Sequence, residues 1–288
     1  MLTESKATKP ALRYHGGKFR LAPWIMSFFP DHATYVEPFG GAASVLLQKD
    51  RCYAEIYNDL DSSVANFFRV LRNPDTRATL IELLVLTPYS REQFELAWET
   101  SEDPIEDARR LAIRAQMGFG SAGATKGHTG FRIDTKRDYG TAQHAWAQYP
   151  EAIAIAGQRL TGVLIENRQA IEVMLQHDTA TTLHFVDPPY VHSTRVLGRG
   201  KRRYYRHEMT DQDHIDLLVS LRKLTGFVVL SGYASDLYNE HLQGWRQFTT
   251  DSRISAVRGS VVRKEVVWLN PACVDALERQ SAQKRMFA

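Results

Sequence analysis

The stretch that decides the fold is a short apolar strand running into a glycine pair, Ala33-Thr34-Tyr35-Val36-Glu37-Pro38-Phe39-Gly40-Gly41. Pro38 ends the strand, because proline cannot donate to a strand ladder. The glycines let backbone approach a ligand closely, and the apolar residues 42–47 predict a helix whose first N–H groups face that ligand. Alone, this pattern is more typical of a tight turn, and it is neither a Gly-x-Gly-x-x-Gly motif nor a Walker loop.

The alternation of strand and helix continues along the chain from this point. Further strands are predicted at 52–57, 163–165, 183–186, 226–231 and 266–269, and apolar residues recur at helical spacing between 64 and 71. Continuous apolar strands separated by helices predict a parallel sheet covered on both faces. The helix-rich interruption at 73–160 predicts an inserted domain, which leaves 1–72 and 161–288 as the α/β domain.

Composition excludes several classes of protein without indicating a function. The chain has 288 residues, a formal net charge of +3 and two cysteines, Cys52 and Cys273. Two cysteines predict neither a disulfide framework nor a zinc site, and no metal is expected. The first residues lack the apolar stretch of a signal peptide, and no apolar run approaches membrane-spanning length. We therefore expect a cytoplasmic protein that does not bind membranes.

An acidic residue follows the strand at 52–57. Asp59 lies where a carboxylate can accept hydrogen bonds from both hydroxyls of a ribose. The competing interpretation is an N-cap, with Asp59 or Asp61 satisfying the first turn of the next helix. Either interpretation fits Asp59 alone. Together with the glycine pair, Asp59 favours a ligand that contains a nucleoside.

The sharpest signal is Asp187-Pro188-Pro189-Tyr190, directly after the strand at 183–186. Two prolines fix two φ angles and remove two N–H donors, which leaves neighbouring carbonyls as outward acceptors. One carboxylate and one carbonyl can accept both hydrogens of a planar amino group, while an aromatic ring stacks on its heterocycle. A rigid strand exit is the competing interpretation, but the position after a buried strand favours a site.

Four motifs, in the same order along the chain, resemble those of the Dam-like (D12 class) DNA adenine-N6 methyltransferases. They are Arg13-Tyr14-His15-Gly16-Gly17-Lys18, the stretch from Val36 to Ser44, Asn58-Asp59-Leu60-Asp61, and Phe185-Val186-Asp187-Pro188-Pro189-Tyr190. The resemblance spans nearly all of the chain outside the interruption. His15 and Ala43 depart from the family pattern, which commonly has a small residue and a glycine there.

The resemblance implies a Rossmann-like S-adenosylmethionine-dependent methyltransferase sheet with helices on both faces and an inserted, mainly helical target-recognition domain at 73–160. It implies a catalytic group formed by Asp187, Pro188, Pro189 and Tyr190. It implies that S-adenosylmethionine is bound by Tyr14, Gly17, Lys18, Glu37, Phe39, Gly40, Gly41, Asp59, Asn167 and Asp187. Of these, Asn167 matches its motif only loosely.

The implied reaction methylates N6 of adenine in double-stranded DNA. A base inside a duplex is out of reach, so the adenine must rotate into the pocket. Asp187 and the Pro188 carbonyl would then accept hydrogen bonds from its amino group, and Tyr190 would stack on the ring. Asp187 also favours this acceptor over the alternatives, which are cytosine N4, adenine in RNA, and a non-catalytic DNA-binding homologue.

Two basic stretches predict where DNA would bind. One lies between Arg109 and Arg137, and the other begins within about ten residues of the tetrapeptide. A solvated loop is the usual interpretation of such a run. Its position next to the tetrapeptide favours phosphate contacts and base stacking instead. The DNA-contacting candidates are Lys126, Arg132, Arg195, Lys201, Arg202, Arg203 and Tyr204.

Specificity and biological role are not readable from these motifs. The Asn-Gly-Leu-x-Arg run of relatives that recognise GATC is absent, because residues 118–124 are Gly-rich instead. Site-specific and relaxed methylation both remain open. A restriction-modification partner, a regulatory enzyme and a phage self-protection enzyme would share these motifs, in a bacterial or phage-infected cell. We expect a monomer or a weak homodimer.

Overall fold

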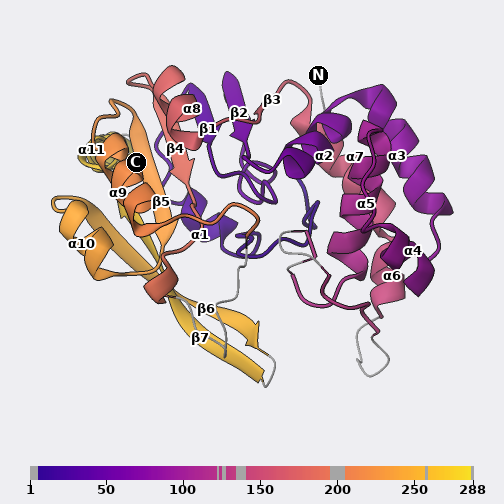
Figure 1. Ribbon diagram of the computed structural model, residues 1–288. Helices are drawn as coiled ribbons and strands as arrows, with labels where there is room; N and C mark the ends of the chain where they lie inside the picture. The colour runs from indigo at the N-terminus through magenta and orange to yellow at the C-terminus, as the bar shows by residue number, and fades with distance from the viewer. Residues whose placement is uncertain are drawn as a thin grey trace.

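The computed structural model describes residues 6–121, 123–124, 128–133, 141–194, 205–256 and 259–286. In this part of the chain a seven-stranded sheet has the order β3-β2-β1-β4-β5-β7-β6 (Figure 1). Neighbouring strands from β3 to β5 pair in parallel, whereas β7 is antiparallel to both β5 and β6. The strands are β1 (Thr34–Glu37), β2 (Ala54–Asn58), β3 (Leu164–Glu166), β4 (Thr182–Val186), β5 (Phe227–Gly232), β6 (Arg246–Ala256) and β7 (Gly259–Leu269).

The parallel pairing of β1 to β5 confirms the sequence prediction. The prediction that the strand at 266–269 extends a parallel sheet was wrong, because β7 is antiparallel to β5. Strand β6 was not predicted, and β7 begins seven residues before the predicted 266–269. Polar residues are interspersed along residues 246–256, so this strand lacks the continuous apolar run of a strand buried on both faces. It lies at the edge of the sheet, where pairing on one side is sufficient.

Helices cover both faces of the sheet because buried side chains alternate along each strand. Tyr35, Tyr57, Phe185 and Val229 pack on one face, in a cluster that reaches helices α1, α2, α5, α7 and α11. The neighbouring residues on β4 and β5, Val186 and Val228, pack on the other face with α8, α9 and α10. The helices of the first face are α1 (Ala22–Met26), α2 (Ser62–Arg72), α5 (Pro104–Met117), α7 (Tyr149–Leu160) and α11 (Pro271–Met286); those of the second are α8 (Ala170–Gln176), α9 (Asp211–Leu221) and α10 (Asp236–His241).

The described part of 73–160 is mainly helical and packs around α2 on the right of Figure 1. It contains α3 (Pro74–Leu86), α4 (Arg91–Leu96), α5, α6 (Ala142–Ala147) and α7. Leu80, Leu111 and Ile153 from these helices belong to the same apolar cluster as Tyr35 of the sheet. The helical segment and the sheet are therefore joined through α2, which follows β2 directly.

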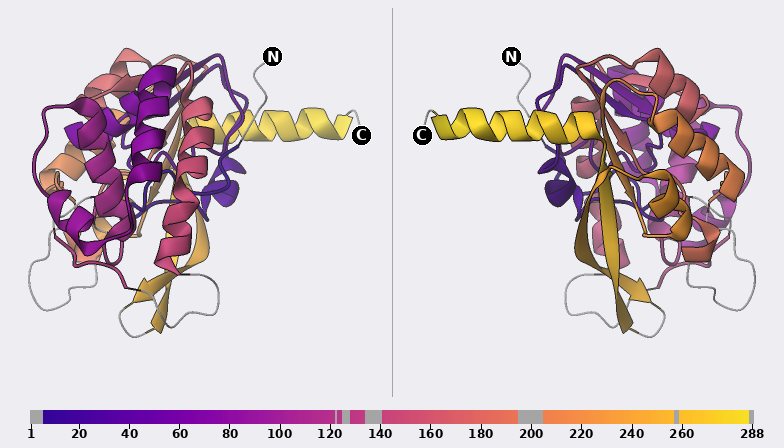
Figure 2. Two further views of the ribbon diagram at one scale, coloured as in Figure 1. Left: turned by 90° about the vertical axis from the view of Figure 1, so that its right-hand side faces the viewer. Right: turned by 90° about the vertical axis from the view of Figure 1, so that its left-hand side faces the viewer.

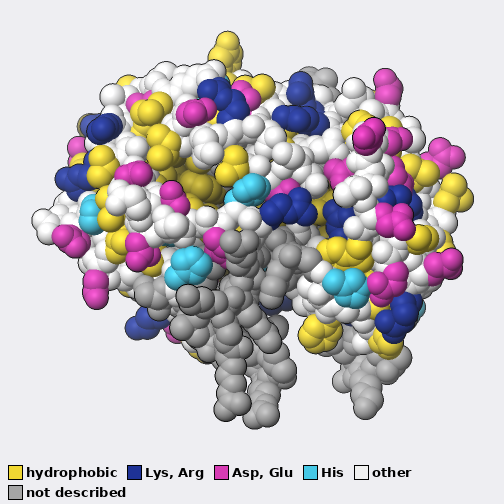
Figure 3. Space-filling model, viewed as in Figure 1, with side chains coloured by type: hydrophobic (Ala, Val, Ile, Leu, Met, Phe, Trp, Pro, Cys, Tyr) yellow, Lys and Arg dark blue, Asp and Glu magenta, His cyan; other side chains and the backbone are white. Residues whose placement is uncertain are grey.

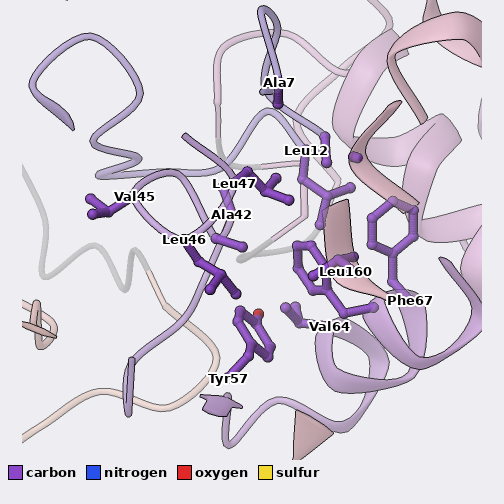
Figure 4. Packing of buried hydrophobic residues seen from close by; sticks show 14 of the residues in the cluster. Ala7, Leu12, Ala42, Val45, Leu46, Leu47, Tyr57, Val64, Phe67 and Leu160 are labelled. Atoms are coloured by element: carbon purple, nitrogen blue, oxygen red, sulfur yellow. The ribbon is translucent and has the colours of Figure 1, made fainter. Parts of the chain in front are cut away.

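The helix predicted for 42–47 was wrong, because the backbone bends there in a way that a helix does not allow. Gly41 and Ala43 have φ angles of 48° and 51°, in the left-handed region that side chains other than glycine rarely adopt. Residues 41–48 form turns, and the Leu46 N–H donates to the Glu37 carboxylate at 3.0 Å. Figure 4 shows Leu46 of this turn close to Tyr57 of β2.

Two elements extend away from the body of the protein. Strand β5 ends at Gly232, which pairs with Val266, so the outer half of the β6–β7 hairpin continues beyond the carboxyl end of β5 (Figure 2). Helix α11 projects to one side, and only residues in its first two turns are buried. Among the described helices, none combines the length and the apolar character that crossing a membrane requires.

Candidate active site

A cavity of about 710 Å³ lies beside the carboxyl ends of β1, β2 and β4, where parallel sheets bind their ligands. Figure 3 shows a hollow near the centre of this face, with hydrophobic side chains in its floor. Four sequence motifs, separated by up to about 170 residues, meet there. The predicted site residues that line the cavity are Tyr14, Gly17, Lys18, Glu37, Phe39, Gly40, Gly41, Asp59, Asp187 and Pro189.

The glycine pair is required by aromatic side chains packed on both of its residues. A Cβ atom at Gly40 would lie 2.1 Å from the Tyr57 ring, and one at Gly41 would lie 2.9 Å from the Tyr14 ring. The Tyr57 hydroxyl also donates to the Gly41 carbonyl at 2.7 Å. The predicted close approach of backbone to a ligand is thus built from a turn held by tyrosines. The helix N–H groups expected beside it are not formed.

Asp59 connects the ends of β1 and β2. Its carboxylate accepts hydrogen bonds from the Gly41 N–H and the Asp61 N–H, both at 2.8 Å. Asp61 caps α2 through the Ser63 N–H, so the N-cap is Asp61 and Asp59 is left facing the cavity. Burial raises the pKa of Asp59 to about 6, although both backbone donors oppose this shift.

Glu37 serves the turn from beneath. One carboxylate oxygen accepts from the Tyr35 hydroxyl at 2.8 Å and from the Leu46 N–H at 3.0 Å. Burial raises the pKa of Glu37 to about 8, against the effect of these hydrogen bonds. Glu37 is also among the residues that line the cavity.

Lys18 joins the amino-terminal motif to the tetrapeptide. Its Nζ lies 2.9 Å from Asp187 Oδ1, donates to the Gly16 carbonyl at 3.1 Å, and donates to the Tyr190 hydroxyl. The Lys18 side chain is 4% exposed and that of Asp187 17%. The three oxygen atoms match the three N–H donors of the lysine ammonium.

Asp187 is the predicted acceptor for an amino group, and opposing effects act on the charge of its carboxylate. Burial raises the pKa of Asp187, and the nearby charge of Glu265 acts in the same direction. Lys18 and the Ser231 hydroxyl oppose this effect by bonding to the carboxylate. Tyr190 and the buried Pro188 stand behind Asp187 and do not line the cavity in the described part of the chain.

Asn167 lies behind the cavity wall. Its amide donates to the carbonyls of Asp59 and Leu60 at 2.7 and 3.1 Å, and its oxygen accepts from Ser62 at 3.2 Å. The cavity wall here consists instead of the next residues, among them Arg168 and Ile171. The motif identified the segment, and packing decided which side chain in it faces the cavity.

The sequence analysis missed the segment 205–209, which also lines the cavity. The Tyr205 ring meets His15 edge to face at 5.5 Å, and Arg206 pairs with Asp61 at 3.1 Å. Arg206 belongs to the basic run that we interpreted as contacting DNA. Because Arg206 pairs with Asp61, the N-cap of α2, and lines the cavity, part of this basic run belongs to the cavity wall.

Most DNA-contacting candidates lie outside the described residues, namely Lys126, Arg195, Lys201, Arg202, Arg203 and Tyr204. Arg132 is described and half-buried, on a backbone pairing in which its N–H donates to the Met117 carbonyl. The arginines at the start of the stretch between Arg109 and Arg137 form contacts within the protein. Arg109 and Arg110 pair with Glu106, and the buried Arg114 donates to the Ala97 carbonyl.

Within the described ranges, no group of three or more His, Cys, Asp or Glu residues is placed to hold a metal ion.

Comparison with known proteins gives one family match. The family model for the D12 class N6 adenine-specific DNA methyltransferase matches residues 14–254. No relative is detected among curated proteins. Two solved structures are distantly similar. The precorrin 8W decarboxylase of Methanobacterium thermoautotrophicum has 12% identity and a TM-score of 0.32, over 87% of this chain and 88% of that one. An S-adenosylmethionine-dependent methyltransferase of Agrobacterium tumefaciens has 11% identity and a TM-score of 0.37, over 88% of this chain and 61% of that one.

Proposed function

Because this chain belongs to the D12 class N6 adenine-specific DNA methyltransferases, we propose that it methylates N6 of an adenine rotated out of duplex DNA into the cavity beside Asp187. The cofactor of this activity is S-adenosylmethionine, which supplies a methyl group on a positively charged sulfur. The observation that carries the proposal is the meeting of Asp187, Lys18 and the glycine turn at one cavity.

The residues of the cavity fit this cofactor. A volume of about 710 Å³ lies within the range of roughly 300–1,000 Å³ that is usual for small-molecule sites. Backbone is exposed to the ligand at Gly40 and Gly41, where side chains would collide with tyrosines. Asp59 supplies acceptors for ribose hydroxyls, and Phe39 and Ile171 supply apolar surface for an adenine ring.

The acceptor end of the cavity fits an amino group. The Asp187 carboxylate accepts one N–H of the adenine amino group, and the Pro188 carbonyl accepts the other. These hydrogen bonds orient the nitrogen lone pair toward the methyl carbon and away from the ring. Bound S-adenosylmethionine would supply the methyl group for the new N–C bond, and the electron pair of its broken S–C bond would remain on sulfur. The amino group then loses a proton, for which Asp187 is the nearest base.

We assign recognition of DNA to the helical segment 73–160 and to the residues that follow the tetrapeptide, including the candidates named above. Phe119 and Ile133 support this assignment, because their side chains are 65% and 62% exposed and they lie close to the bridge between Gly118 and Phe131. An exposed aromatic ring such as that of Phe119 suits stacking on a base, and Ile133 adds exposed apolar surface beside it. We further propose site-specific or relaxed methylation by a monomer or weak homodimer, in the cytoplasm that holds the DNA.

The test is incubation of the purified protein with tritium-labelled S-adenosylmethionine and unmodified duplex DNA, followed by nucleoside analysis. We expect the label in N6-methyldeoxyadenosine. Label in N4-methyldeoxycytidine, label only on RNA, or no label would each contradict the proposal. Mapping of the methylated positions then shows whether methylation is site-specific and at which sequence.

Cofactor binding is predicted to weaken at acidic pH because of Asp59. A carboxylate accepts both ribose hydroxyls only when it is ionised, and the pKa of Asp59 is raised to about 6. The dissociation constant for the cofactor should therefore be constant above about pH 7 and should rise as the pH falls through about 6. Asp59→Asn should bind roughly ten- to hundredfold more weakly at neutral pH, as expected for a lost hydrogen bond to a charged group.

The measurement is isothermal titration calorimetry from pH 5 to 8, with circular dichroism to establish that each sample is folded. In Asp59→Asn the rise below pH 6 should disappear. Asp31→Asn is the control, because Asp31 is exposed and lies outside the residues lining the cavity. The same rise in Asp59→Asn as in the unmodified protein would show that another group is responsible.

A further inference from the structure

A second buried carboxylate stands on the far side of the tetrapeptide from the cavity. Glu265 of β7 is 5% exposed, and its Oε2 accepts a hydrogen bond from the Tyr190 hydroxyl at 3.0 Å. The Tyr233 hydroxyl also bonds to this carboxylate. Glu265 lies 75 residues from Tyr190 in the chain and is not among the residues that line the cavity.

We propose that Glu265 is a positioning residue for methyl transfer. Its carboxylate holds the hydroxyls of Tyr190 and Tyr233 in place, and through the Tyr190 hydroxyl it is connected to Lys18, which pairs with Asp187. The inference rests on the proposed function, in which Asp187 accepts a hydrogen bond from the amino group of the target base.

The two tyrosines form one aromatic unit held from β7. Their ring centroids are 4.4 Å apart with an interplanar angle of 48°. The Arg263 guanidinium lies 5.3 Å from the centroid of the Tyr233 ring. Arg263 and Glu265 are two residues apart on a strand and therefore share one face of the sheet. Strand β7 thus supplies one group to the Tyr233 ring and one to both tyrosine hydroxyls.

The charges connect Glu265 to Asp187 through Lys18. Lys18 Nζ contacts Asp187 directly and reaches Glu265 through the Tyr190 hydroxyl, which accepts from Lys18 and donates to Glu265. The pKa of Tyr190 is raised well above its ordinary value, first by burial and then by Asp187 and Glu265. The hydroxyl therefore stays protonated and can relay the contact. The Lys18 ammonium therefore pairs directly with the Asp187 carboxylate and is linked to the Glu265 carboxylate through the Tyr190 hydroxyl.

The groups that act on the charge of Asp187 come from several elements. They are Lys18 before α1, Glu37 of β1, Tyr190 after β4, Ser231 of β5, Tyr238 of α10 and Glu265 of β7. Among these, Lys18 favours the ionised form of Asp187 and the Glu265 charge disfavours it. Neutralising Glu265 should therefore lower the pKa of Asp187 and extend activity to lower pH.

Glu265 is remote from the cofactor, which separates its effect from a general loss of the site. It is not among the cavity-lining residues of the described chain. Its removal should thus lower kcat and leave the cofactor dissociation constant unchanged. A residue that only stabilised the fold would change neither kcat alone nor the acidic limb of the pH profile.

The experiment compares Glu265→Gln and Glu265→Ala with the unmodified enzyme, on unmodified duplex DNA between pH 5 and 8. We expect kcat to fall roughly tenfold in Glu265→Gln and hundredfold in Glu265→Ala, the range for a lost hydrogen bond to a charged group. The acidic limb of the Glu265→Gln profile should move to lower pH. Asp251→Asn is the matched control, because Asp251 is an exposed carboxylate on the neighbouring strand β6.

A double-mutant cycle with Tyr190→Phe tests the route of the effect and does not need the alanine variant to fold. If Glu265 acts through the Tyr190 hydroxyl, the kcat of the double variant Tyr190→Phe/Glu265→Gln should lie within about twofold of the kcat of the slower single variant. Multiplying losses would overturn the proposal. Unchanged kcat and an unmoved acidic limb in Glu265→Gln would do the same. Absence of methyl transfer by the unmodified protein would instead refute the proposed function.

Discussion

Asp187→Ala is expected to bind the cofactor with nearly unchanged affinity and to lose methyl transfer, with kcat lower by at least about a thousandfold. Removing one preorganised hydrogen-bonding group from an active site costs roughly 10²–10³ in kcat. Asp187 should reach the upper end of this range, because its loss also leaves the Lys18 ammonium, 4% exposed, without its direct counter-ion. Such an ammonium would repel the positive charge that develops on the adenine nitrogen.

Asp187→Asn separates the two causes. It keeps one oxygen that can accept from the amino group but removes the charge that Lys18 pairs with, so a comparable loss of kcat would assign most of the effect to charge. Single-turnover assays measure the chemical step, and calorimetry measures cofactor binding. Asp31→Ala, in an exposed carboxylate away from the cavity, should behave as the unmodified enzyme. Retained turnover in Asp187→Ala would show that the catalytic assignment is wrong.

Glu55→Gln is expected to lower the free energy of unfolding by about 3–5 kcal/mol, as for a buried ion pair that loses one partner. Glu55 of β2 accepts from Lys49 Nζ at 2.7 Å and from both terminal nitrogens of Arg159 at 2.7 Å each. All three residues are at most 5% exposed. The substitution would leave two cations buried without a counter-ion, and would loosen the contact of β2 with α7.

The same carboxylate makes stability depend on pH. Burial alone would raise the pKa of Glu55, but Arg159 and Lys49 more than offset it and hold that pKa below its ordinary value. For an acid whose pKa is lowered by folding, the stabilisation is complete above the unfolded-state pKa of about 4.3. It is lost as the pH falls from there through the lower folded-state value. Glu55→Gln should therefore show a weaker loss of stability in acid.

Urea unfolding followed by circular dichroism measures both effects. Glu278→Gln is the control, because Glu278 forms an exposed ion pair with Arg246 and its loss should change stability by less than about 0.5 kcal/mol. A loss below about 1 kcal/mol in Glu55→Gln would mean that the cluster contributes little to the fold.

Local sequence was sufficient wherever neighbouring residues decide the structure. The five strands that pair in parallel follow mainly apolar runs, because a strand buried on both faces has few polar positions. The order of Lys18, Gly40, Asp59 and Asp187 along the chain was enough to predict the family, which the match to residues 14–254 confirms. Carboxyl ends of parallel strands share one edge of the sheet, so these residues were expected to meet.

Local sequence failed where a backbone N–H group or a charged side chain bonds to a residue from another element of the fold. The apolar residues 42–47 favour a helix, but Glu37 accepts the Leu46 N–H and Asp59 accepts the Gly41 N–H. Similarly, Arg206 resembles a solvated or DNA-binding cation in the sequence, whereas the structure pairs it with Asp61, 145 residues away. In each case the partner comes from another element, and nothing in the local pattern indicates it.

The sequence by itself determined the sheet of parallel strands, the glycine turn and the chemical identity of the tetrapeptide, because each depends on residues adjacent in the chain. Only the tertiary structure decided that β6 and β7 complete the sheet and that Asn167 turns away from the cavity. It alone placed Glu265 behind Tyr190 and Arg159 beside Glu55. The physical reason is that a buried charge or hydroxyl must find a partner, and that partner is set by packing between elements.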